Sequence, residues 1–269
     1  MNALLMSLLA LELAAMPPDE VVAQFEDGVY TYTGGEYKDE AFHYRLLKPK
    51  TIEPGRKYPV VLFLHGAGER GADNRLQLLY LPEQMAKPEN REKFPCFLIA
   101  PQCRPEKQWV NVPWGAEKST LPERPSDQLL AAMGMLDDVL KKYPVDDKRV
   151  YLTGLSMGGY GCWDAAARWP ERFAALAPIC GGGDESTAAQ FAKLPIWAIH
   201  GDADQAVPVA RSRNMIEAVK KAGGAPIYVE LKGVGHNSWT PGYSDPNGVL
   251  PWMFEQVREG GGADARPDK

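Results

Sequence analysis

The stretch that decides the fold is Val150-Tyr151-Leu152-Thr153-Gly154-Leu155-Ser156-Met157-Gly158-Gly159, residues 150–159. Its first residues are typical of a buried strand, and residues 157–169 have a helical pattern that ends at Pro170. A strand and a helix joined by Gly-x-Ser-x-Gly form a nucleophile elbow, a turn so tight that it needs small residues around the serine. We therefore expect the Ser156 hydroxyl at a helix N-terminus, where main-chain N–H groups favour negative charge. The alternative is a glycine-rich turn with a solvated serine, and the rest of the chain has to decide between the two.

Composition limits the classes of protein to consider. The chain has 269 residues, of which 45% are hydrophobic and 24% charged, which is ordinary for a globular protein and predicts one α/β domain over residues 21–258. The net charge of −5 gives no electrostatic basis for binding nucleic acid or an anionic membrane. No segment reaches the ~18 consecutive apolar residues that a membrane-spanning helix needs.

The two ends of the chain differ from its body. Residues 1–16 are apolar, but Glu12 interrupts them and the first basic residue is Lys38. Residues 1–20 are therefore either an export signal or an ordinary N-terminal helix. Residues 259–269 are rich in Gly, Ala and Asp, which predicts a flexible tail.

The cysteines do not predict a metal centre or a disulfide framework. Cys96 and Cys103 flank an expected strand and lie too far apart to be bridged, and no CxxC spacing occurs. The four cysteines are expected to be buried free thiols. A metal site made of His65, His200 and Asp202 lacks a short ligand spacing, so we predict neither a metal nor a cofactor.

Short apolar runs alternate with helical patterns along most of the chain. This alternation predicts an open, mostly parallel sheet with helices on both faces. The expected elements are an early strand at 42–47, buried strands at 60–64, 97–100, 149–153, 174–179, 196–200 and 227–231, and helices at 128–143, 157–169, 209–222 and 249–257. The Pro-rich segment 102–125 is expected to form a surface loop over the site.

Polar residues follow four of the expected strands, at the edge where active sites of such sheets lie. His65-Gly66-Ala67-Gly68-Glu69 follows the strand at 60–64, and the elbow follows the strand at 149–153. Residues 201–208 contain two acids, and His236 lies in a glycine-flanked loop after the last strand. His43 is expected to be structural, His65 and His200 to brace their loops, and Glu69 to pair with Arg70 or Arg75.

These residues supply the parts of a serine nucleophile. A serine hydroxyl attacks efficiently only when a nearby imidazole takes its proton, a role that fits His236. An aspartate would then orient the imidazole, and both Asp202 and Asp204 are candidates. The main-chain N–H groups of Ala67 and Met157 would bind the oxyanion.

Four motifs carry a resemblance to the esterase branch of the α/β-hydrolases: YPVVLFLHGAGERGADN (58–74), GLSMGGYG (154–161), HGDADQAVP (200–208) and GVGHNSW (233–239). The chain resembles the polyhydroxybutyrate-depolymerase-like and feruloyl-esterase-like carbohydrate esterases and the phospholipase/carboxylesterase group over residues 40–257. The resemblance implies an α/β-hydrolase fold and a triad of Ser156, Asp204 and His236. It also favours Asp204 over Asp202, which we expect to form a turn, and implies Ala67 and Met157 as oxyanion donors.

The expected function is hydrolysis of a carboxylic ester through an acyl-enzyme, on feruloyl, acetyl or other short esters of carbohydrate. Aromatic residues in the expected rim loops are candidates for substrate contact: Trp109, Trp114, Tyr160 and Trp239. The alternatives are a small dipeptidyl or oligopeptidyl serine peptidase and a non-catalytic binding module. A small-molecule or polysaccharide-linked ester as partner favours a secreted or periplasmic location over the cytoplasm. The sequence does not indicate an oligomeric state.

Overall fold

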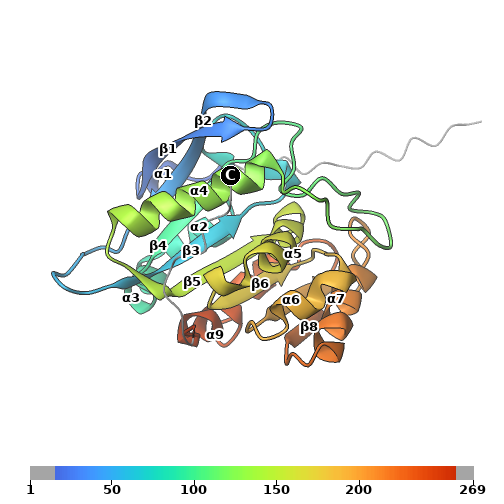
Figure 1. The fold of residues 1–269 in the computed structure, drawn as a ribbon. Helices are drawn as coiled ribbons and strands as arrows, with labels where there is room; N and C mark the ends of the chain where they lie inside the picture. The colour runs from blue at the N-terminus through green and yellow to red at the C-terminus, as the bar shows by residue number, and fades with distance from the viewer. Residues whose placement is uncertain (1–15, 259–269) are drawn as a thin grey trace, which may run out of the picture.

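The computed structural model describes residues 16–258, which form an eight-stranded sheet with the order β1-β2-β4-β3-β5-β6-β7-β8 (Figure 1). Strands β1, β2 and β4 pair antiparallel, and all other neighbours pair in parallel, which confirms the predicted mostly parallel sheet. The strands are β1 (Phe25–Gly34), β2 (Tyr37–Leu47), β3 (Tyr58–Leu64), β4 (Phe97–Pro101), β5 (Val145–Leu155), β6 (Ala175–Ile179), β7 (Trp197–Gly201) and β8 (Ile227–Leu231).

Helices cover both faces of the sheet. One face carries α4 (Asp127–Lys142), α5 (Met157–Arg168), α6 (Ala188–Phe191) and α7 (Ala210–Lys221), which lie in front of the strands in Figure 1. The other face carries α2 (Leu81–Ala86), α3 (Pro88–Lys93), α8 (Trp239–Ser244) and α9 (Val249–Glu255). A short helix α1 (Asp19–Val22) and four 3₁₀ turns complete the described part: η1 (Ala67–Glu69), η2 (Leu76–Leu78), η3 (Pro170–Arg172) and η4 (Glu185–Thr187).

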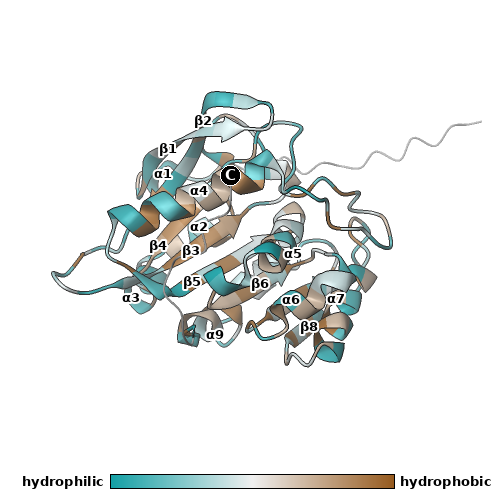
Figure 2. Cartoon of the chain, viewed as in Figure 1, coloured by the Kyte–Doolittle hydropathy of each residue, from teal (hydrophilic) through white to brown (hydrophobic). Residues whose placement is uncertain are grey.

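Strand β3 shows how one sheet serves two hydrophobic cores. All seven of its residues are buried, as the unbroken apolar run predicts for a central strand. Val60, Leu62 and Leu64 pack into the core under α4 and α5, whereas Val61 and Phe63 pack into the core under α2 and α9. This alternation follows from the two-residue period of a strand. In Figure 2, β3 and β4 are coloured as hydrophobic, while the outer β1–β2 hairpin is largely hydrophilic.

The register of the parallel strands brings their carboxyl ends to one edge. Leu64 of β3 pairs with Gly154 of β5, and Gly154 pairs with Pro178 of β6. Gly201, at the end of β7, pairs with Leu231 of β8. The loops that follow these strands are therefore neighbours at the same rim, as expected from the sequence.

Two sheet edges differ from the sequence expectation. The early strand begins at Tyr37 rather than residue 42, and it forms a hairpin with β1, which was not anticipated. Gly35, in the hairpin turn, has φ +56, a conformation that glycine adopts readily. Strand β8 was expected to be buried, but Ile227 is 37% exposed because β8 is the last strand and pairs only with β7.

Other expectations concern the loops and the cysteines. Residues 102–125 contain no helix or strand, and the loop is anchored by its buried Trp109, Val110 and Val112. All four cysteines are buried free thiols, as predicted. Within residues 16–258, no helix has the length and apolar character needed to cross a bilayer. Residues 1–20, expected to be an export signal or an N-terminal helix, lie largely outside the described residues, and the predicted tail lies entirely outside them.

Candidate active site

The elbow between β5 and α5 holds Ser156 in a conformation that its neighbours enforce. Ser156 has φ 52 and ψ −118, in the left-handed region that non-glycine residues rarely adopt. Its main-chain N–H donates to the Ile179 carbonyl at 2.9 Å, which ties the turn to β6. A Cβ added to Gly158 would lie 1.8 Å from the Leu64 carbonyl oxygen, so only glycine fits there. Close packing against β3 and β6 thus fixes the direction of the serine side chain.

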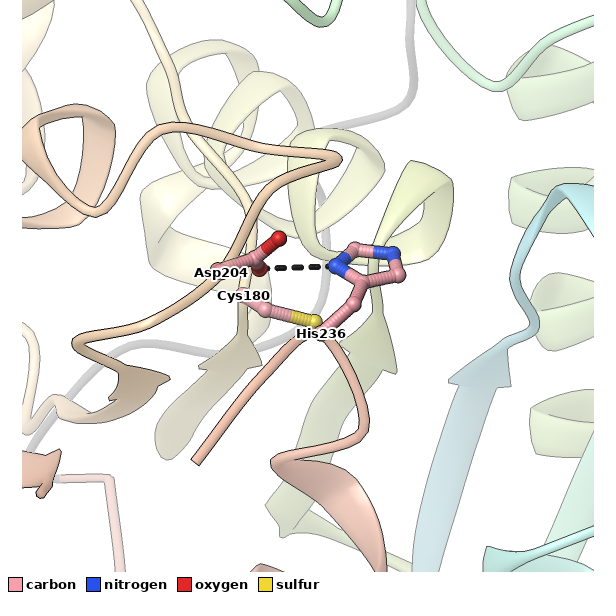
Figure 3. Close-up of side chains that lie close together, drawn as sticks. All are labelled: Cys180, Asp204 and His236. Carbon is pink, nitrogen blue, oxygen red and sulfur yellow. Dashed lines mark hydrogen bonds and ion pairs between the residues drawn. The ribbon is translucent and has the colours of Figure 1, made fainter. Parts of the chain in front are cut away.

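Three side chains that are distant in the sequence meet at this turn. His236 Nε2 lies 2.9 Å from Ser156 Oγ, and His236 Nδ1 lies 2.7 Å from Asp204 Oδ2. Figure 3 shows the second contact, with the imidazole of His236 next to the Asp204 carboxylate. Ser156 is 8% exposed and the Asp204 side chain is fully buried, whereas the His236 side chain is 28% exposed. Both contacts are within hydrogen-bond range, so the structure brings the predicted residues together in the predicted order.

Asp204 accepts hydrogen bonds from several donors. They include the main-chain N–H groups of Ala206 and Val207, at 2.8 and 2.9 Å, and the imidazole Nε2 of His200, at 3.1 Å. Burial alone would raise the pKa of Asp204, but the hydrogen bonds from His200, His236 and Val207 outweigh it and hold the pKa well below its usual range. Asp204 is therefore ionised at neutral pH.

The ionised acid fixes the tautomer of His236. A carboxylate can only accept a hydrogen bond, so Nδ1 of His236 carries the proton that it shares with Asp204. The neutral ring then presents the Nε2 lone pair to the Ser156 hydroxyl, as a general base requires. Asp202 is placed differently, because it is exposed and accepts from the main-chain N–H of Gly233 at 2.6 Å. Asp202 thus shapes the turn, in line with its expected role.

The histidine is enclosed by a tryptophan and a thiol. The Trp239 ring meets the His236 ring edge-on, with centroids 5.2 Å apart. Cys180, just after β6, places its sulfur beside the pair, and the candidate ligand atoms of Cys180, Asp204 and His236 lie within 4.8 Å of one another (Figure 3). Burial raises the pKa of the Cys180 thiol, so it stays protonated, and Asp204 Oδ2 is already engaged by two histidines. The cluster therefore has the chemistry of a hydrogen-bonded pair rather than that of a metal centre.

His65 orients the peptide that carries the predicted donor Ala67. Its Nε2 accepts from the main-chain N–H of Cys103 at 2.9 Å, so Nδ1 carries the proton and donates to the Gly66 carbonyl at 2.6 Å. Burial lowers the pKa of His65 to about 4, which keeps the ring neutral. Because a trans peptide points its C=O and N–H in opposite directions, fixing the Gly66 carbonyl also fixes the Ala67 N–H. The bracing role expected for His65 thus has a definite geometry.

Two of the four aromatic residues expected to contact substrate, Trp109 and Tyr160, are fully buried, which corrects that expectation for these two. Trp109 is 1% exposed and donates its indole N–H to the His65 carbonyl at 2.9 Å. Tyr160 is 1% exposed, and its hydroxyl donates to the Trp114 carbonyl at 2.7 Å. Trp239 is 9% exposed and packs on His236. These side chains hold the loops and the histidine in place.

Trp114 is the one half-buried residue among the four aromatic residues expected to contact substrate. It lies next to Arg70, which the sequence did not identify as part of the site. The Arg70 guanidinium lies 5.9 Å from the Trp114 ring centroid. Arg70 also donates from Nε to the Ala67 carbonyl at 2.8 Å, and so reaches the loop beside the elbow. The position of Arg70 directly after the HGAGE segment could have indicated that it lies near the site. The expected ion pair with Glu69 does not form.

The chain has the fold of the α/β-hydrolases, with a mostly parallel sheet that helices cover on both faces. Residues 49–245 match the phospholipase/carboxylesterase family model, and the chain belongs to this family. The predicted resemblance to this family is thus confirmed.

Similar proteins support this classification. A thermostable esterase of known structure is 39% identical, with a TM-score of 0.79 over 88% of this chain and 64% of that protein. A bifunctional acetylxylan esterase/xylanase from Neocallimastix patriciarum is 27% identical over 116 residues, which are 43% of this chain and 16% of that protein. A ferulic acid esterase from Anaeromyces mucronatus has a TM-score of 0.60 over 90% of this chain and 96% of that chain, at 13% identity, and so shares the fold. The chain thus spans less than two thirds of the first two proteins.

Proposed function

We propose that the protein hydrolyses carboxylic esters through an acyl-enzyme formed on Ser156. The observation that carries the proposal is the pair of contacts made by His236, at 2.9 Å to the Ser156 hydroxyl and 2.7 Å to the Asp204 carboxylate. This arrangement fits a nucleophile, a general base and an orienting acid. Family membership supports the same reaction class.

In the proposed first half-reaction, Ser156 Oγ attacks the ester carbonyl carbon while its proton passes to His236 Nε2. The carbonyl oxygen becomes an oxyanion, which the main-chain N–H groups of Met157 and Ala67 bind. Met157 is the first residue of α5, so its N–H has no acceptor within the helix. When the intermediate collapses, the ester C–O bond breaks and the alcohol leaves with the proton of His236.

In the second half-reaction, water attacks the acyl-enzyme. His236 takes a proton from the water, and the acid product leaves as the proton returns to Ser156 Oγ. Asp204 stays ionised throughout and stabilises the imidazolium that forms twice in the cycle. These steps use only side chains and main-chain groups of this chain, and so need neither a metal nor a cofactor.

The substrate class that we propose is a short acyl or feruloyl ester attached to carbohydrate. The names of two similar proteins, an acetylxylan esterase/xylanase and a ferulic acid esterase, support this choice. Trp114 remains as the half-buried aromatic surface for an aryl group or a sugar ring, with the Arg70 guanidinium beside it. We also propose a secreted or periplasmic location, because a polymeric carbohydrate substrate would be met outside the cytoplasm.

The test compares the wild type and Ser156→Ala on p-nitrophenyl acetate, methyl ferulate and a peptide p-nitroanilide, together with labelling by a fluorophosphonate probe. We expect the wild type to be labelled and to hydrolyse both esters, and the variant to lose turnover by about 10⁴-fold or more while its circular dichroism is unchanged. Preferential cleavage of the anilide would instead identify a peptidase. A folded wild type with neither labelling nor turnover would indicate a binding module and reject the proposal.

A further inference from the structure

Glu69 carries a buried carboxyl group beside the elbow that the reaction above does not use. The residue is 4% exposed, and its Oε2 atom has no hydrogen-bond partner among residues 16–258. The ion pair expected with Arg70 or Arg75 is not formed, because Arg75 pairs with Asp19 and Arg70 donates to the Ala67 carbonyl. A buried carboxyl with an unsatisfied oxygen is costly, so it points to a role other than stability.

The position of this carboxyl is defined by its contact with Gly66. A Cβ added to Gly66 would lie 3.0 Å from Glu69 Oε2 and 3.6 Å from Ser156 Cβ. It would also lie 2.7 Å from Leu155 Cδ1, so a side chain cannot fit there without displacing its neighbours. The carboxyl of Glu69 and the side chain of Ser156 therefore approach the same side of the Gly66 main chain.

Three side chains hold three successive peptide units of the 65–70 loop. The Glu69 carboxyl lies against Gly66, where a Cβ added to the glycine would be 3.0 Å from Oε2. His65 donates to the Gly66 carbonyl, and Arg70 donates to the Ala67 carbonyl. The Ala67 N–H belongs to the middle unit, so its direction depends on the units on both sides. Side-chain contacts on these three peptide units therefore determine the direction of the Ala67 N–H.

We propose that Glu69 is a positioning residue, whose carboxylate holds the 65–70 loop in the conformation that presents the Ala67 N–H to the oxyanion. The inference rests on the proposed ester hydrolysis and adds a residue to it. Glu69 acts through Gly66 and the loop, without touching the substrate. Oε2 lacks a partner because the Glu69 side chain lies under the loop, where few donors reach the lone pairs of its carboxylate.

The ionisation of Glu69 links this role to pH. Burial raises the pKa of Glu69 to about 7, against the opposing effects of the main-chain N–H groups of Gly66 and Glu69 and of the charges of Arg70 and His236. A carboxylate accepts from an N–H group more strongly than a neutral carboxyl does. The loop is therefore held most firmly above the pKa, and activity should decline as Glu69 takes up a proton.

Two substitutions at this position separate the hydrogen bond from the charge. Glu69→Gln keeps an amide oxygen that can accept from Gly66 N–H but cannot ionise, whereas Glu69→Ala removes the acceptor. The matched control is Asp164→Asn on α5, which removes another buried carboxyl whose pKa burial raises. Asp164 pairs with Arg168, and the proposed reaction does not involve either residue.

We expect Glu69→Ala to lower kcat about tenfold or more with KM within about twofold, since positioning an oxyanion donor acts on the transition state. Glu69→Gln should stay within about threefold of the wild type at pH 8.5, and the acid midpoint of kcat/KM should move down by about half a pH unit or more. Asp164→Asn should leave kcat and the midpoint unchanged. All rates are normalised to the sites titrated by the fluorophosphonate probe, so that loss of folded protein does not count.

The outcomes distinguish this inference from the proposed function. If the wild type is labelled and active but Glu69→Ala keeps the wild-type kcat and pH profile, the positioning role is wrong and ester hydrolysis stands. The role is also wrong if Asp164→Asn shifts the midpoint as much as Glu69→Gln does, because the effect would then belong to any buried carboxyl. A wild type with no labelling and no turnover rejects both proposals together.

Discussion

Two loops at the same rim each hold a buried acid near His236, and the two acids ionise in opposite ways. In the 200–208 loop, Asp204 accepts from two main-chain N–H groups and two imidazoles, and its pKa lies well below the usual range. In the 65–70 loop, Glu69 leaves one oxygen without a partner, and its pKa rises to about 7. Burial is severe in both cases, so the number of donors around each carboxylate decides which form is stable.

This difference matches the two proposed tasks. A carboxylate that stabilises an imidazolium must stay ionised through the reaction, and the donors around Asp204 ensure that. A carboxyl that shapes a loop can instead change its protonation near neutral pH, which makes loop geometry sensitive to pH. The comparison therefore predicts that losing the first acid damages the chemistry directly, while changing the second alters its pH dependence.

The largest effect should come from Asp204→Asn. The amide cannot enforce the Nδ1–H tautomer of His236, so the base would be presented to Ser156 in the wrong form. We expect kcat on p-nitrophenyl acetate to fall by about 10³–10⁴-fold. The measurement is steady-state kinetics at pH 8, where Asp204 and Glu69 of the wild type are both ionised.

The control for this prediction is Asp202→Asn in the same loop. Asp202 is exposed, and among the described residues its side chain is hydrogen-bonded only by the main-chain N–H of Gly233. Its loss should lower kcat by no more than about threefold, in keeping with small effects of surface substitutions. If Asp202→Asn proved the more damaging of the two, the assignment of the acid would have to be reversed.

The sequence predicted the parts of the site that are tied to strand ends. Ser156, Asp204 and His236 follow three strands of a parallel sheet, and the order of such strands brings their carboxyl ends to one rim whatever the loop lengths. Glycines made the elbow predictable as well, because the approach of Gly158 to β3 excludes any side chain. The apolar runs of β3, β4 and β5 were equally clear, since both faces of a central strand are buried.

The sequence could not predict features that depend on how loops pack. Trp109 and Tyr160 have the composition of a binding surface, but their polar atoms bond to loop carbonyls and their rings are buried. Strand β8 has an apolar sequence, yet its edge position leaves Ile227 exposed. Glu69 resembled a surface ion-pair partner because the two arginines nearby were visible, whereas its burial under Gly66 was not.

A smaller loss than that of Asp204→Asn is expected for His65→Phe, which tests the other loop. Phenylalanine fills similar space but cannot donate to the Gly66 carbonyl or accept from Cys103, so the Gly66–Ala67 peptide would be free to tilt. Because removing an oxyanion donor costs about 10²–10³ in turnover, misdirecting it should cost about 10² in kcat, with little change in KM.

The comparison for this variant is His43→Phe, on strand β2. His43 is exposed and lies on β2, which β4 and β3 separate from β5 and the elbow, so its replacement should leave kcat within about twofold of the wild type, as for other surface sites. Burial already keeps His65 neutral, with its pKa lowered to about 4, so His65 should not contribute to the pH profile above pH 5. A kcat for His65→Phe equal to that of the wild type would show that the loop holds its shape without this ring.

The smallest effect should be on stability, and it has the opposite sign to the effect on activity. Burial raises the pKa of Glu69 to about 7 in the folded state, whereas in the unfolded chain its pKa is the ordinary glutamate value of 4.5. Between these values the native state binds more protons than the unfolded state, so the free energy of unfolding falls as pH rises. Glu69→Gln lacks this slope. Its stability relative to the wild type should therefore increase between pH 5 and pH 8 by roughly 2 kcal/mol, measured by urea unfolding at both pH values.

Asp164→Asn provides the reference for a buried carboxyl outside the loop. A difference between Glu69→Gln and the wild type that is the same at both pH values would mean that Glu69 is ionised at pH 5 already, and the contrast with Asp204 would disappear.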